Sequence, residues 1–146
     1  TIMSLVAGDK LLPDRLRELI IMRVSWLAAC DYEWSQHWMA SLYFGLTEAE
    51  LVAVRDWVGS DAFNDAERVV LAATDELVGS RSIAPQTWRA LAECFPEERE
   101  KLEIVACIGN WHMCALLING LCIPLEEGLQ SWPPDGREPP ASSVSS

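Results

Sequence analysis

Apolar residues along this chain recur at the three- and four-residue spacing of helices, and no segment alternates between apolar and polar positions as a half-buried strand would. Residues that favour helix ends divide this pattern. Capping-box sequences start at Thr47 and Asn64, Pro13 suits a first turn, and Gly45 and Gly79 suit terminations. The sequence therefore predicts an all-α fold of about six helices, at residues 13–29, 31–44, 48–59, 65–79, 85–94 and 97–121.

Composition divides the chain into three regions. Residues 1–12 form a short lead-in, and residues 13–128 carry the helical pattern of one domain. Residues 129–146 are rich in proline and serine and contain few apolar side chains. Such a segment buries too little to offset the entropy of ordering, so we expect a flexible tail, or one that straps across a neighbour through Trp132.

The most apolar run, residues 102–123, is interrupted by polar side chains at Glu103, Asn110, His112 and Asn119. Polar groups at these positions are costly inside a lipid bilayer. We therefore predict a buried helix of a soluble domain here, and no membrane span.

The formal net charge is −11, and no basic stripe interrupts the acidic sequence. Nucleic-acid binding depends on cations that replace the counterions of phosphates, so the charge argues against a nucleic-acid partner. It equally disfavours attachment to anionic membranes.

Five cysteines are scattered along the chain, and no two of them form a C-x-x-C pair. An odd number of cysteines in apolar helical contexts is typical of a reducing compartment and not of a disulfide framework. We therefore expect a cytoplasmic protein.

Candidate chemistry gathers in the stretch from residue 15 to residue 45. Glu18 lies in an otherwise apolar run, and Cys30, Glu33 and His37 follow it in the string C-D-Y-E-W-S-Q-H. A thiol, a carboxylate and an imidazole at positions i, i+3 and i+7 share one face of a helix. This face is the candidate catalytic site.

The spacing resembles that of the carboxymuconolactone decarboxylase family, which includes the alkylhydroperoxidase D-like proteins with the motif E-x11-C-x-x-C-x3-H. The flanking strings L-R-E-L-I-I-M-R-V-S-W-L, G-L-T-E-A-E, N-D-A-E-R and I-G-N-W-H-M agree with a Y-E-W subgroup over residues 11–128. The resemblance implies an alkylhydroperoxidase D-like helical bundle that assembles as a trimer or hexamer. It also implies that Glu18 projects from the preceding helix toward Cys30 and His37.

The chain departs from that motif at Glu33, where redox members of the family have a second cysteine. Without a local resolving thiol, Cys30 cannot cycle through a disulfide within one helical turn. Glu33 and His37, at i and i+4, are instead placed to share a proton directly or through one water.

The resemblance supplies a model for this chemistry, because decarboxylase and lactone-processing members are described as cofactor-free enzymes with a histidine general acid or base. We therefore predict an acid–base enzyme of the decarboxylase, lyase, isomerase or cyclase type. Its substrate would be a small cyclic carboxylic acid, lactone or related carbonyl compound, and no cofactor is predicted. The expected walls of the site are the aromatic residues Trp26, Tyr32, Trp34 and Trp38.

Structural interpretations of the same residues stay open. Glu18 can form an ion pair with Arg17 or Arg23, Glu33 can complement a helix dipole, and Cys30 can be a packed apolar residue. Further along the chain, His112 and Asn119 can line the pocket or tie helices together. A metal site built from Glu18, Glu33, His37 and His112 is conceivable, but no tight ligand cluster demands one and none is predicted.

Two other functions also stay open, namely a thiol-dependent peroxidase that uses Cys30 and a non-catalytic protein that holds a small molecule in the same pocket. The apolar faces of the first and last long helices exceed what one thin bundle covers. We therefore expect a homo-oligomer, whether a trimer, a hexamer or a dimer.

Overall fold

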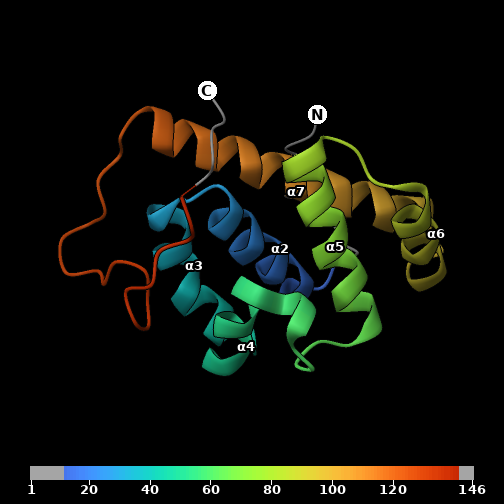
Figure 1. Cartoon of the computed structure of the whole chain (residues 1–146), viewed down its shortest axis with the longest axis horizontal. Helices are drawn as coiled ribbons and strands as arrows, with labels where there is room; N and C mark the ends of the chain where they lie inside the picture. The colour runs from blue at the N-terminus through green and yellow to red at the C-terminus, as the bar shows by residue number, and fades with distance from the viewer. Residues whose placement is uncertain (1–11, 142–146) are drawn as a thin grey trace.

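The computed structural model describes residues 12–141, and within them the fold is all-helical, as the sequence predicts (Figure 1). The elements in chain order are α2 (Asp14–Leu27), α3 (Asp31–Tyr43), α4 (Glu48–Ala53), the 3-10 helix η1 (Val54–Gly59), α5 (Asp65–Ser80), α6 (Pro85–Cys94) and α7 (Glu98–Gly120). No strand occurs in this part of the chain. The lead-in, residues 1–12, lies outside the described residues except for Leu12.

Helix α2 is the centre of the fold, with α3, α5 and α7 packed around it (Figure 1). Its residues Leu19, Ile20, Ile21 and Met22 are consecutive and fully buried. Four successive positions point in four directions around a helix, so all sides of α2 are covered. The nearly continuous apolar pattern of the first helix therefore correctly indicates burial on most sides.

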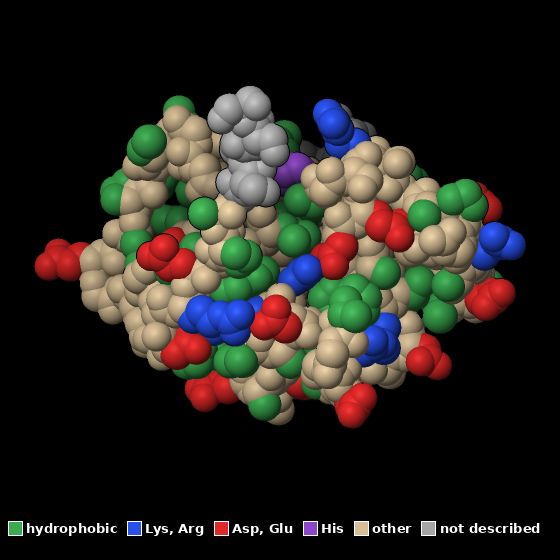
Figure 2. Space-filling model, in the orientation of Figure 1, with side chains coloured by type: hydrophobic (Ala, Val, Ile, Leu, Met, Phe, Trp, Pro, Cys, Tyr) green, Lys and Arg blue, Asp and Glu red, His purple; other side chains and the backbone are tan. Residues whose placement is uncertain are grey.

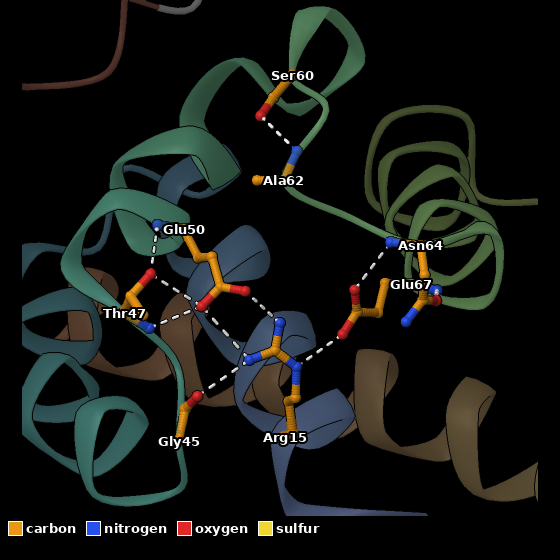
Figure 3. A network of polar contacts seen from close by, with 8 residues as sticks. All are labelled: Arg15, Gly45, Thr47, Glu50, Ser60, Ala62, Asn64 and Glu67. Carbon is orange, nitrogen blue, oxygen red and sulfur yellow. Dashed lines mark hydrogen bonds and ion pairs between the residues drawn. The ribbon is translucent and has the colours of Figure 1, made fainter.

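Both predicted capping boxes form, and Arg15 on α2 joins them (Figure 3). The guanidinium of Arg15 donates to Glu50 in the first turn of α4 and, over 2.7 Å, to Glu67 in the first turn of α5. It also donates to the carbonyl oxygen of Gly45 over 3.1 Å. One arginine thus fixes the starts of two helices on the central one.

The helix predicted for residues 48–59 is divided into α4 and the 3-10 helix η1. Arg23 on α2 donates to the carbonyl oxygens of Val54 and Arg55 over 3.0 and 2.9 Å. Its guanidinium satisfies two carbonyls that an unbroken α-helix would have paired with later amides. Asp56 then takes a non-helical conformation.

Helix α7 packs against α2 and α5 along one side only. Its residues Ile104, Cys107 and Ile108 are buried, but Met113, Leu116 and Leu117, and Leu121 just after its end, are more than half exposed. The expectation of a wholly buried helix is therefore wrong for its C-terminal half, because the chain supplies no element to cover that face among residues 12–141. By length and composition alone α7 would also pass as a membrane-spanning helix, a test that core helices of soluble proteins pass as well.

After α7 the chain returns to α3, where residues 131–137 form a packed strap (Figure 1). The backbone N–H of Trp132 and the hydroxyl of Ser131 donate to the carboxylate of Asp31 over 2.8 and 2.6 Å. The indole of Trp132 is only 5% exposed. Flexibility expected from composition therefore does not describe this part of the tail, because one buried indole and an anchoring carboxylate outweigh the lack of other apolar residues.

On the face shown in Figure 2, acidic and basic side chains are scattered, with hydrophobic side chains exposed between them, and acidic residues are the majority in the sequence. This distribution agrees with the absence of a basic stripe in the sequence.

Candidate active site

A tight turn between α2 and α3 brings the predicted site residues together. Ala29 adopts a left-handed conformation with φ of 49°, and the N–H of Cys30 donates back to the carbonyl oxygen of Ser25 over 2.9 Å. The side-chain amide of Asn119, at the end of α7, donates to the carbonyl oxygen of Ala28 over 2.9 Å and secures the turn. The two helices thus run back against each other, which sets Glu18 beside the face of α3 that carries His37.

Glu18 is the buried anchor of the site, with 1% of its surface exposed. Its Oε2 pairs with Nδ1 of His37 over 2.8 Å, and its Oε1 accepts from the guanidinium of Arg17 over 2.9 Å. The hydroxyl of Ser41 lies 3.4 Å from the same Oε2. Burial alone would raise the pKa of Glu18, but the hydrogen bonds and charges of His37 and Arg17 outweigh burial and hold this pKa below its ordinary value.

The state of Glu18 fixes the orientation of His37. Because the carboxylate of Glu18 is ionised, Nδ1 of His37 must carry a hydrogen and donate it. The second ring nitrogen, Nε2, is then left to accept or donate a proton. With 20% of its side chain exposed, His37 is the reachable member of the pair.

Glu33 is as deeply buried as Glu18 but lacks the hydrogen-bonding and charged partners that keep Glu18 ionised. It is 2% exposed, and neither carboxyl oxygen has a hydrogen-bond partner within residues 12–141. Burial raises the pKa of Glu33 to about 8. The site therefore contains one ionised carboxylate, Glu18, and one carboxyl group that keeps its proton at neutral pH.

The partner of His37 in the structure is thus Glu18, which the family resemblance implied, whereas helical spacing alone suggested Glu33. A direct Glu33–His37 hydrogen bond is not formed among the described residues. Glu18 also forms the ion pair with Arg17 that the structural interpretation of the sequence proposed. Arg23, the other candidate for this ion pair, pairs with Asp75. Glu18 therefore has both the structural and the orienting role that the sequence left open.

Cys30 lies at the start of α3 with no exposed surface. Burial raises the pKa of its thiol to about 11. Since the thiolate is the nucleophilic form, a neutral buried thiol is a poor centre for peroxide chemistry. Cys30 itself forms no disulfide in the part of the chain that the structure describes.

The tryptophans expected to wall the site pack together on another face of α3. The ring centroids of Trp26 and Trp34 lie 5.4 Å apart and those of Trp34 and Trp38 lie 5.9 Å apart. Trp132 of the strap packs against the first two, and the guanidinium of Arg55 lies over both their rings. This cluster holds the strap against α2 and α3. Its indole rings contact each other, and the ring that contacts His37 is that of Trp111.

The aromatic neighbour of His37 is Trp111 on α7, which the sequence did not single out. The two rings meet edge to face, with centroids 4.5 Å apart. One turn further along α7, Cys114 lies close enough to Glu33 for the carboxylate to raise the pKa of its thiol, in addition to the larger effect of burial. No local feature of the sequence marks Trp111 or Cys114 as a site residue, because their places depend on the tertiary packing of α7.

The remaining predicted residues lie around this centre. The hydroxyl of Tyr32 donates to Glu126 over 3.1 Å, so Tyr32 connects α3 with the chain after α7. Asn119 secures the α2–α3 turn, and His112 is half-buried beside Trp111. Within residues 12–141, no group of three or more His, Cys, Asp or Glu side chains is arranged to hold a metal ion.

A separate hollow of about 1050 Å³ opens at the end of α2. Its lining includes Trp26, Arg55, Trp132 and Arg137, and it does not include Glu33 or His37. Trp26 thus faces this hollow and the strap.

Comparison with known proteins places the chain in a family. The model of the carboxymuconolactone decarboxylase family matches residues 2–76, which is more than half of the sequence and includes Glu18, Cys30, Glu33 and His37. The chain therefore belongs to this family. No curated protein sequence matches it significantly.

Several solved structures share the fold. A protein of unknown function from Agrobacterium tumefaciens, with a suggested AhpD antioxidant role, superposes with a TM-score of 0.76 at 20% identity, over 86% of this chain and 88% of that one. The debrominase Bmp8, in a Cys-to-Ala variant with bound 2,3,4-tribromopyrrole, has a TM-score of 0.74 at 21% identity, over 86% and 67%. A peroxidase-related protein from Silicibacter sp. TM1040 has a TM-score of 0.72 at 19% identity, over 85% and 65%. These likenesses confirm the alkylhydroperoxidase D-like fold.

Proposed function

We propose that this protein is a cofactor-independent enzyme in which His37 and Glu33 move protons at a small cyclic carboxylic acid, lactone or related carbonyl compound. The observation that carries the proposal is the Glu18–His37 hydrogen bond beside a buried Glu33 whose oxygens are unpaired within residues 12–141. Two carboxyl groups held in opposite protonation states by their surroundings provide an acid and the support for a base.

His37 acts as the base. Glu18 holds the Nδ1–H of the ring and stabilises the positive charge that develops when Nε2 takes up a proton. Arg17 keeps Glu18 ionised from the other side through its own hydrogen bond. Glu18 and Arg17 are therefore positioning residues, and Nε2 of His37 is the atom that meets the substrate.

Glu33 acts as the acid. When Nε2 of His37 removes a proton from the carbon next to a carbonyl, the electron pair of the C–H bond forms a C=C bond and the π electron pair of the carbonyl moves to its oxygen, which gives an enolate. Glu33 then supplies its proton to the enolate or to a leaving group. In the decarboxylation variant the electron pair comes from the bond to the departing CO₂, and an acid of the site protonates the carbon that is left.

The alternative hypothesis, a thiol-dependent peroxidase that uses Cys30, receives less support from the site. A peroxidase of this fold would need Cys30 as a thiolate, and burial opposes that state. The bound ring of 2,3,4-tribromopyrrole in the debrominase supports the choice of a small cyclic substrate for this fold.

We also propose that the protein works as a homo-oligomer. Met113, Leu116, Leu117 and Leu121 form one exposed apolar face on α7, on the same helix as Trp111. An apolar stripe of this kind on a soluble protein is typical of a contact between subunits.

The proposal is tested by turnover. Cyclic ketones, lactones and carboxylic acids are incubated with the protein in deuterated water, and deuterium incorporation or product formation is followed by mass spectrometry. We expect His37→Gln and Glu33→Gln to lower the rate by about 10²- to 10⁴-fold, while Glu93→Gln at an exposed position leaves it unchanged. Unchanged turnover in both site variants would show that the proposed proton transfer is wrong.

A further inference from the structure

Buried polar atoms without partners concentrate in the candidate site. Within residues 12–141, four buried side-chain atoms lack a hydrogen-bond partner, and three of them are Oε1 and Oε2 of Glu33 and Nε1 of Trp111. The fourth is Nε of Arg55, in the tryptophan cluster. Each such group costs about 1–3 kcal/mol when it stays unpaired. Two neighbouring residues that both bear this cost point to a bound group that satisfies them.

The residues that carry these unpaired atoms belong to two helices, and contacts of neighbouring side chains connect them. Glu33 and His37 lie one turn apart on α3, and Trp111 and Cys114 lie one turn apart on α7. The ring of Trp111 meets that of His37 edge to face at 4.5 Å, and Cys114 is close enough to Glu33 to respond to its charge. Side chains of α7 therefore reach the face of α3 that carries the unpaired carboxyl group, with Trp111 at His37 and Cys114 near Glu33.

We propose that the indole N–H of Trp111 and the carboxyl O–H of Glu33 together bind one oxygen of the substrate, namely the carbonyl oxygen beside the carbon at which His37 acts. This inference rests on the proposed function and extends it. It makes Trp111 a catalytic residue and specifies an enolisable carbonyl compound as the substrate class.

The chemistry of the two donors suits this role. An indole N–H only donates, and a protonated carboxyl group in a dry site donates without an accompanying charge. Two fixed donors stabilise an oxygen most strongly when negative charge develops on it during the reaction. Neither donor is a cation, so the pair favours a neutral carbonyl that becomes an enolate over a carboxylate that is charged from the start.

The probe is 4-nitrophenol, because the oxygen of its phenolate form resembles an enolate oxygen. In an NMR spectrum of the ¹⁵N-labelled protein, the indole resonance of Trp111 is assigned by its disappearance in Trp111→Phe. We expect it to move downfield when 4-nitrophenol is added. The indole N–H groups of Trp34 and Trp57 already donate to Pro133 and Asp75 over 2.9 Å, so their resonances are internal controls that stay in place.

Binding of the probe provides the second measurement. Trp111→Phe keeps an aromatic ring at this position, although a smaller one, and removes the N–H, and we expect it to weaken 4-nitrophenol binding about tenfold. Trp88→Phe, at an exposed tryptophan, is the matched control and leaves binding unchanged. Glu33→Gln still has a donor, so it retains most of the binding even where turnover is lost.

The outcomes separate this inference from the proposed function. A probe that does not bind, a Trp111 resonance that stays in place, or equal binding by the Trp111→Phe variant would overturn the oxygen-binding role. If His37→Gln retained full turnover while the Trp111 response persisted, the proposed base would be wrong and the oxygen-binding pair would stand.

Discussion

Replacement of Glu33 by glutamine should stabilise the protein, and increasingly so as the pH rises. In the folded chain Glu33 releases its proton only near pH 8, compared with about 4.5 in an unfolded chain. A carboxyl group with a raised folded-state pKa binds a proton that the unfolded state has lost, so the free energy of unfolding falls as the pH rises between these two values. Glutamine has nearly the same shape, carries no charge and does not titrate.

The magnitude follows from the two pKa values. The raised pKa of Glu33 lowers the free energy of unfolding by about 1 kcal/mol at pH 5 and by about 4 kcal/mol at pH 8. The difference in unfolding free energy between Glu33→Gln and the unmodified protein should therefore grow by about 3 kcal/mol across this range. Glu33 is almost fully buried, so solvent screening does not reduce this figure.

Urea denaturation at a series of pH values measures the effect, with circular dichroism as the signal. Glu93→Gln, which removes the same charge from an exposed position, is the control and should show no comparable growth. A difference for Glu33→Gln that stays constant from pH 5 to pH 8 would mean that Glu33 ionises like an exposed glutamate, and the division of roles between the two carboxyl groups would fail.

Three further predictions concern the rest of the chain. Cys30 should resist thiol labelling in the folded protein before and after peroxide treatment, while the exposed Cys94 is labelled readily; mass spectrometry that finds an oxidised Cys30 would restore the peroxidase reading. Trp132→Ala should lower the unfolding free energy by about 3 kcal/mol, since it removes a buried indole from the tryptophan cluster, and an unchanged thermal midpoint would contradict the packing of the strap. Leu117→Glu should shift the mass in light scattering toward the monomer, and an unmodified protein that is already monomeric at working concentration would exclude the homo-oligomer.

The sequence predicts the helices well because their boundaries depend on local residues. The capping boxes at Thr47 and Asn64 form as predicted, and the uniformly apolar first helix is the buried centre. The break after α4 could not be read from local residues, since its cause is Arg23, which reaches the carbonyls of Val54 and Arg55 from another helix. For residues 131–137 the sequence left a flexible tail and a strap held by Trp132 as alternatives, and it could not decide between them because Asp31 and the tryptophan cluster that hold the segment are distant in the sequence.

Part of the candidate site could also be predicted from the sequence. Motif spacing indicates that Glu18, Cys30, Glu33 and His37 share a site, and helical geometry places the last three on one face. Spacing does not indicate which carboxyl group pairs with His37, because that depends on how α2 lies against α3. Trp111 could not be identified for a related reason, because its contact with His37 depends on the packing of α7, and Trp111 lies 74 residues after His37 in the sequence.

Titration of the glutamate side chains, followed by ¹³C NMR of their carboxyl carbons, tests the assignment of acid and base most directly. Glu33→Gln and Glu18→Gln identify the two resonances by their loss. The proposed mechanism predicts that the Glu33 carboxyl titrates near pH 8 and the Glu18 carboxyl below its ordinary pKa, within the same protein. A Glu33 carboxyl that titrates near 4.5, the ordinary value for glutamate, would contradict its role as the acid.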